Sequence, residues 1–203
     1  MCFSAKASLG AFLIGLVGSL LLIASRNGGR TNISFGIFFI FISLIQLMDF
    51  AIWSDLDNKI GINRIATMIG PLLNVGQPTI MYLIKIAVFQ HYRLDFITLL
   101  NSGYALYLAK VYSLFIEGGD LTTKVEQGHL KWPWLKYANP VAYLVMFVIN
   151  ALYLTEFRFS LLVTIITGFF LAMSKSYFAY HVGEIWCYTG AFIPALLYLF
   201  GRK

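Results

Sequence analysis

Long apolar stretches are the feature of this chain that most restricts how it can fold. Short segments that hold most of the charge separate them, and they cover residues 8–25, 33–53, 65–89, 96–116, 140–154, 159–174 and 177–200. A helix needs about 20 apolar residues to cross the hydrocarbon core of a bilayer, and a membrane-spanning backbone must satisfy its own hydrogen bonds. The sequence therefore predicts an all-α, polytopic transmembrane helical bundle of seven helices.

Composition supports a membrane protein with no separate soluble domain. The chain is 59% hydrophobic and 12% charged, whereas an ordinary soluble domain has about 25% charged residues. Because the spans use most of the 203 residues, residues 1–203 are predicted to form a single domain whose partner is the lipid bilayer. The formal net charge of +6 is spread over loops and tail, which favours contact with lipid headgroups and not with nucleic acid.

Two of the seven stretches leave their own topology open. Residues 140–154 and 159–174 are each short for a hydrocarbon core about 30 Å thick, and only residues 155–158 separate them. They are either two full helices joined by a tight turn, which we prefer, or a re-entrant pair. Within the third stretch, Pro71 and Pro78 are predicted to kink the helix and free backbone carbonyls.

Orientation follows from the basic residues in the short loops. The short loops opposite the N-terminal face hold Arg26, Arg30, Arg93 and Arg158. Because basic residues in short loops favour the cytoplasmic side, the N-terminus is predicted outside and the C-terminus in the cytoplasm.

Two carboxylates lie inside apolar stretches, where a charge is costly and usually functional. At about 1.5 Å per residue, Asp49 lies about 6 Å from the end of its stretch at Trp53. By the same measure Glu184 lies about 10 Å from the start of the last stretch at Tyr177. Both of these ends belong to the predicted N-terminal face, so the two carboxylates are predicted to lie in one layer of the bundle.

Other polar and aromatic side chains are predicted to surround these acids in or near that layer. They are Gln46, Trp53, Asn74, Gln77, Lys110, Tyr177 and His181. In one interpretation they line a water-accessible pocket that binds a small molecule, a proton or a cation, with Lys110 as the counter-charge. In the other they form a structural network of hydrogen bonds and ion pairs that fixes helix packing.

A metal site is a further hypothesis for the same residues. His181 and Glu184 are three positions apart on one helix face, so together with Asp49 they could coordinate a metal ion. A histidine within a helix is, however, more often hydrogen-bonded than metallated. The sequence identifies no cofactor, and a bound cation is one candidate. Retinal is not expected, because residues 177–200 contain no lysine to hold it.

The longest link, residues 117–139, mixes aromatic rings with lysines at residues 131–137. Amphipathic rings and lysines are typical of the membrane–water interface. An ordinary connecting loop is the alternative for this segment.

Three short patches carry a pattern that can be compared with known proteins. They are the opening Met1-Cys2-Phe3-Ser4-Ala5, then Gln46-x-x-Asp49-x-x-x-Trp53, and Gly183-x-x-Trp186-Cys187. Together they resemble a poorly characterised family of small multi-pass membrane proteins found in microbes and large DNA viruses. The resemblance brings no established activity. It implies one site that contains Cys2, Gln46, Asp49, Trp53 and Trp186, although this chain has Asp49 where the family pattern leads us to expect Glu.

Three functions from different classes follow from these observations. The first is a bundle that binds or transports a small solute, a proton or a cation, and it ranks highest because of the buried acids. The second is an intramembrane hydrolase in which a metal ion activates water. The third is a structural or assembly protein whose polar layer only fixes helix packing.

Overall fold

The computed structural model describes residues 4–25, 29–90, 94–126, 128–154, 165, 168 and 190–200. These residues are mostly helical, as predicted. The α-helices are α1 (Ala5–Ala24), α2 (Gly29–Ser54), α3 (Ile62–Asn74), α4 (Gln77–Phe89), α5 (Phe96–Glu117), α6 (Pro140–Leu154) and α9 (Ile193–Phe200). Between α5 and α6 lie the antiparallel strands β1 (Lys124–Glu126) and β2 (His129–Lys131) and the 3-10 helix η1 (Pro133–Lys136).

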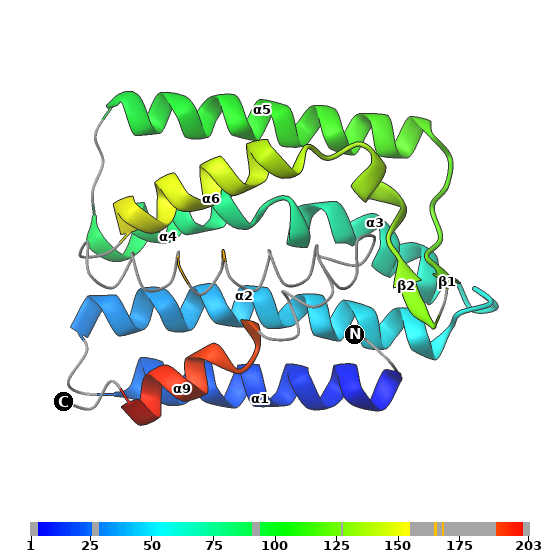
Figure 1. The fold of residues 1–203 in the computed structure, drawn as a ribbon, viewed down its shortest axis with the longest axis horizontal. Helices are drawn as coiled ribbons and strands as arrows, with labels where there is room; N and C mark the ends of the chain where they lie inside the picture. Colours follow the sequence, from blue (N-terminus) through cyan, green and yellow to red (C-terminus); the bar gives the residue numbers. More distant parts are fainter. Residues whose placement is uncertain are drawn as a thin grey trace.

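The helices run side by side along the length of the molecule, with α2 at the centre (Figure 1). Helix α5 lies at one edge, α3, α4 and α6 lie between α5 and α2, and α1 and α9 cover the other side of α2. Helix α2 packs against α1, α3, α4 and α9, and Phe38, Phe39, Ile42 and Ile45 on α2 are fully enclosed. The core of the bundle therefore forms around α2.

Two described helices are long and apolar enough to cross a membrane. They are α1, with 20 residues, and α2, with 26 residues, and the pair α3 and α4 makes a third if it is counted as one bent span. Helix α6 is apolar but shorter. The described residues thus support two or three membrane-spanning segments, and most of the last two predicted stretches lies outside them.

The third apolar stretch forms a broken helix. Helices α3 and α4 meet at an angle of 61°, with Pro71 inside α3 and Pro78 in the first turn of α4. A proline has no N–H to continue the helical ladder, which explains why the helix breaks here. The hydroxyl of Tyr104 on α5 donates to the freed carbonyl of Val75 at 2.8 Å. The predicted kink is confirmed, and the carbonyl of Val75 at the break accepts a hydrogen bond from Tyr104.

Residues 118–126 and 128–139, which we call the cap segment, fold back across one end of the bundle. At this end α1 begins and α2 gives way to α3 (Figure 1). Within the cap segment, Trp132 is 3% exposed and Trp134 is fully enclosed. These two rings are thus enclosed by the protein itself, and the location of residues 131–137 at the membrane–water interface stays a prediction. The indoles pack inward, because their neighbours offer an apolar surface and a hydrogen-bond acceptor.

Candidate functional site

Asp49 is the buried carboxylate around which the described part of the site is built. Its side chain and those of Ser43 and Gln46 on the same helix are fully enclosed, so this side of α2 carries polar groups into the bundle. The indole Nε1–H of Trp132 donates to Asp49 Oδ1 at 3.1 Å. An N–H donor aimed at a buried carboxylate reduces the cost of removing that group from water.

The position of Trp132 is fixed by a stack of aromatic rings. Its indole lies parallel to that of Trp134, with centroids 5.2 Å apart and planes at 17°. Trp134 in turn meets Phe115 of α5 edge to face at 6.3 Å. Trp134 also lies against Gly70 of α3, where an added Cβ would come within 2.2 Å of the ring. Only a glycine allows this close approach between α3 and the cap segment.

A second attachment holds the cap segment to α3 through side-chain hydrogen bonds. The Asn63 amide donates to the Thr123 carbonyl at 2.9 Å and accepts from the Thr123 N–H at 2.9 Å. The hydroxyls of Thr67 and Thr123 are 2.8 Å apart. All three residues are at most 1% exposed, so the contact excludes water. Two separate polar contacts therefore fix the cap segment over the end of α2 and α3.

The turn between α2 and α3 is organised by a second buried carboxylate, Asp55. Its Oδ1 accepts the N–H groups of Lys59 and Ile60 at 2.7 and 3.3 Å, and its Oδ2 accepts those of Ile62 and Asn63 at 2.8 and 3.4 Å. Burial raises the pKa of this carboxyl, but the four backbone hydrogen bonds outweigh burial and leave the pKa below its ordinary value of 3.8. Asp55 is therefore ionised at neutral pH and sets the start of α3.

Asn74 and Gln77 lie at the break between α3 and α4. Gln77 is fully enclosed and Asn74 is 8% exposed. The hydroxyl of Tyr143 on α6 donates to Gln77 Oε1 at 2.5 Å. The break lies near the middle of the bundle, away from the cap segment (Figure 1). The two amides are thus buried as predicted, at a different level from the contact between Asp49 and Trp132.

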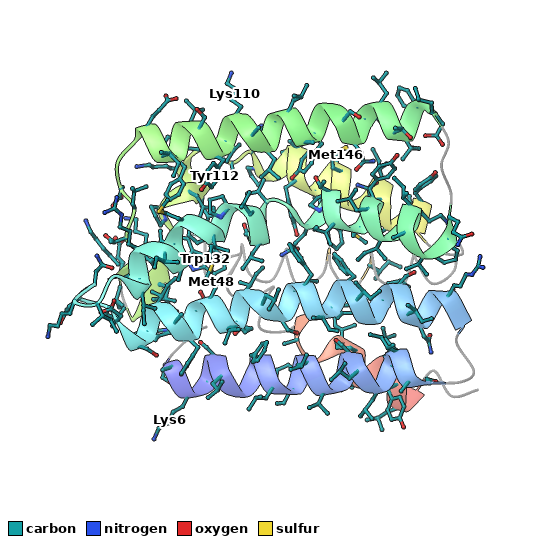
Figure 2. All side chains as sticks on the ribbon, turned by 180° about the vertical axis from the view of Figure 1, so that it is seen from behind. Lys6, Met48, Lys110, Tyr112, Trp132 and Met146 are labelled. Atoms are coloured by element: carbon teal, nitrogen blue, oxygen red, sulfur yellow. The ribbon has the colours of Figure 1, made fainter. Side chains whose placement is uncertain are left out.

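Lys110 does not join the polar layer. Its side chain is exposed on the outer edge of α5 and points away from the bundle and from Trp132, as Figure 2 shows. The face of α5 that packs inward carries Asn101, Tyr104 and Val111 instead. The prediction that Lys110 is the counter-charge of Asp49 is therefore wrong, because the rotation of α5 directs this lysine outward.

Trp53 lies one helical turn beyond Asp49 on α2 and is half-buried. Its indole Nε1 is enclosed and makes no hydrogen bond with any residue that the structure describes. Trp53 therefore lies close to Asp49 along the helix, as predicted, but the structure assigns it no polar contact there.

Five predicted site residues lie outside the described residues. They are Cys2, Tyr177, His181, Glu184 and Trp186. Of the predicted metal ligands only Asp49 is described, and within the described ranges no three His, Cys, Asp or Glu side chains gather as a metal would require. The shared layer of Asp49 and Glu184 and the metal site with His181 remain predictions.

Sequence reasoning did not identify Trp132 as a neighbour of Asp49. The signal was present in the segment Trp132-Pro133-Trp134, since two tryptophans in a short polar link suggest a buried anchor as readily as an interfacial one. The side chain of Thr123 carried no such signal, because its role depends on Thr67, which is 56 residues away.

Comparisons with known proteins add no assignment. The chain matches no protein-family model, no curated protein and no solved structure.

Proposed function

We propose that this chain is a multi-pass integral membrane protein that binds a proton or a cation at Asp49 and moves it, or a small solute coupled to it, across the bilayer. One observation carries the proposal: Asp49 is a fully enclosed carboxylate inside the 26-residue apolar helix α2. Ionisable groups at such positions are costly and mark ion or proton pathways more often than not.

The surroundings of Asp49 suit a group whose charge state changes during function. The N–H of Trp132 contributes a directed hydrogen bond to Asp49 Oδ1 but adds no formal charge. Binding of a proton or a cation changes the charge of the carboxylate and does not alter the charge of the neutral indole.

In this proposal the bundle has seven spans, with the N-terminus outside and the C-terminus in the cytoplasm. Glu184 and His181 on the last span would face Asp49 and complete the ion-binding layer. The motivation is the sequence pattern of that span, in which these two residues share one helix face.

A scaffold role is the second candidate, and one observation favours it. The hydrogen bond from Trp132 to Asp49 joins the cap segment to α2. In a scaffold protein, a buried polar contact of this kind has no role other than to fix the packing of the helices. The two candidates predict different effects on ion flux and on stability when the negative charge of Asp49 is removed.

Asp49→Asn separates the candidates, because an amide oxygen can still accept the Trp132 N–H while the charge is lost. The purified variant is reconstituted into vesicles, and proton flux and radiolabelled sodium uptake are measured against a pH gradient. We expect flux to fall about tenfold or more, as for loss of an essential intramembrane carboxylate. The melting temperature should change by less than about 4 °C.

The matched control is Asp57→Asn, which removes an exposed carboxylate that pairs with Lys59 at 3.3 Å outside the helices. This variant should keep full flux. A wild-type protein without proton or sodium flux, combined with an Asp49→Asn variant that only melts earlier, would favour the scaffold role and contradict the transport proposal.

A further inference from the structure

We propose that the cap segment is the gate of the Asp49 site, and that the site opens to the aqueous face at that end only when Trp132 leaves Asp49. This inference rests on the proposed function and adds to it the route by which an ion reaches the carboxylate. The structure then represents the state in which this end is closed.

The underside of the cap segment is buried while its outer side is exposed. Leu130 on β2 is 1% exposed and Trp134 is fully enclosed, whereas every residue of β1 is exposed. The ion pair between Lys131 and Glu126, at 2.5 Å, joins the two strands to each other. The hairpin therefore has its own internal contacts and can move as a unit without breaking a helix.

The connections at the two ends of the cap segment fit such a movement. At its start, Gly119 has φ +70 with no atom near the position of a Cβ, a conformation that glycine adopts at little cost. At its end, Asn139 caps α6 by accepting the N–H of Val141 at 2.8 Å. The segment thus leaves α5 through a glycine turn and enters α6 at a defined cap, with the attachments to Asp49, to α3 and to Phe115 of α5 between them.

One of those attachments is made to the carboxylate that we propose as the ion-binding group. A hydrogen bond to an ionised carboxylate is stronger than one to a neutral acceptor. A proton or a cation on Asp49 reduces the negative charge on Oδ1 and weakens its bond to Trp132. Loading of the site and release of the cap segment are therefore coupled, and by linkage an open cap favours the loaded site.

A disulfide that holds the cap segment shut tests the gate. The hydroxyls of Thr67 and Thr123 are 2.8 Å apart, so Thr67→Cys with Thr123→Cys places two thiols within bonding reach. Both native cysteines, Cys2 and Cys187, are first replaced by serine. Oxidation should lower proton or sodium flux about tenfold or more if the gate controls entry, and reduction should restore it.

Each single variant, Thr67→Cys or Thr123→Cys, cannot form the bond and should be insensitive to the oxidant. If mass spectrometry shows a complete disulfide and ion flux is unchanged, the proposal that the cap segment is a gate is wrong, and the proposed function is unaffected. If the wild-type protein itself lacks flux under the same conditions, the proposed function fails and the gate fails with it.

A second experiment tests the gate by thiol labelling and does not require a measurement of ion flux. A cysteine introduced by Leu130→Cys lies under the closed cap segment, so an aqueous thiol reagent reaches it only when the cap opens. Adding Trp132→Phe removes the N–H that binds Asp49 and keeps an aromatic ring, and we expect labelling to accelerate about fivefold or more, as for loss of one buried hydrogen bond. An unchanged labelling rate would contradict the gate.

Discussion

At the scale of single residues, two buried aspartates show how surroundings give one side chain different roles. Asp55 receives four backbone N–H groups in a tight turn. Asp49 lies in an apolar helix and receives an indole N–H from the cap segment. The carboxylate of Asp55 is therefore part of the local fold, whereas that of Asp49 is placed where its charge can matter for function.

Replacing Asp55 by asparagine should destabilise the protein at neutral pH. Each carboxylate oxygen accepts two backbone N–H groups, so the new NH₂ group would face two N–H donors whichever oxygen it replaces. The folded state lowers the pKa of Asp55 below 3.8, so its stabilisation is fully present above that pH and is lost as the pH falls through the lowered value. Thermal unfolding in detergent should therefore show a melting temperature several degrees lower for Asp55→Asn at pH 7.

The difference in melting temperature between the wild type and this variant should narrow as the pH falls below 3.8, because the carboxyl of the unfolded chain takes up a proton there while that of the folded chain stays ionised to a lower pH. Asp57→Asn is the control, since its exposed carboxylate contributes little. A gap of equal size at pH 7 and at pH 3 would show that ionisation of Asp55 does not stabilise the turn.

At the scale of elements, α5 and α6 are joined by a pair of amides. Asn101 donates to Asn150 at 2.9 Å and Asn150 donates back at 2.8 Å. The remaining N–H groups of the two amides reach the carbonyls of Ile97 and Pro78, each at 2.9 Å. Asn101 and Asn150 are at most 2% exposed, so every donor is used and no water is needed. We interpret this pair as a packing contact between helices.

A double-mutant cycle measures that contact. Asn101→Ala and Asn150→Ala should each lower the free energy of unfolding, and the coupling between them should be about 1 kcal/mol, within the range found for hydrogen bonds between membrane helices. Ser102→Ala is the control, because its exposed hydroxyl donates to Thr98 within α5. Additive effects of the two alanines would mean that the amides do not stabilise each other.

The elements differ in how far the sequence predicts them. Helix α6 has the predicted bounds, residues 140–154, because an apolar run between polar links needs only local information. The break at Val75 was indicated by Pro71 and Pro78. The cap segment was not predicted, since its structure depends on hydrogen-bond partners that are 56 to 83 residues away in the chain.

At the scale of the whole molecule, the described helices place the turn between α2 and α3 and the start of α5 at opposite ends of the bundle. The turn that contains Lys59 lies at the end closed by the cap segment, and Leu94, before α5, lies at the other end (Figure 1). Cysteines at these two positions, in a chain without Cys2 and Cys187, should react with a membrane-impermeant reagent from opposite sides of intact membranes.

The proposed topology sets the direction of that labelling. Lys59→Cys should react from outside, and Leu94→Cys and Lys203→Cys from the cytoplasm. Reaction of positions 59 and 203 from the same side would require an even number of spans. Reaction of positions 59 and 94 from the same side would mean that the pair α3 and α4 does not cross the bilayer and is re-entrant.

The long separation between the cap segment and its partners has a consequence for synthesis. Asn63 is translated 60 residues before Thr123, an interval of about 3–12 s at ordinary elongation rates. During that time α2 is complete and α3 is being completed, but the polar groups that the cap segment later contacts have no partner from it. Water or the insertion machinery must solvate them until then, so this end of the bundle stays open until the cap segment has been made.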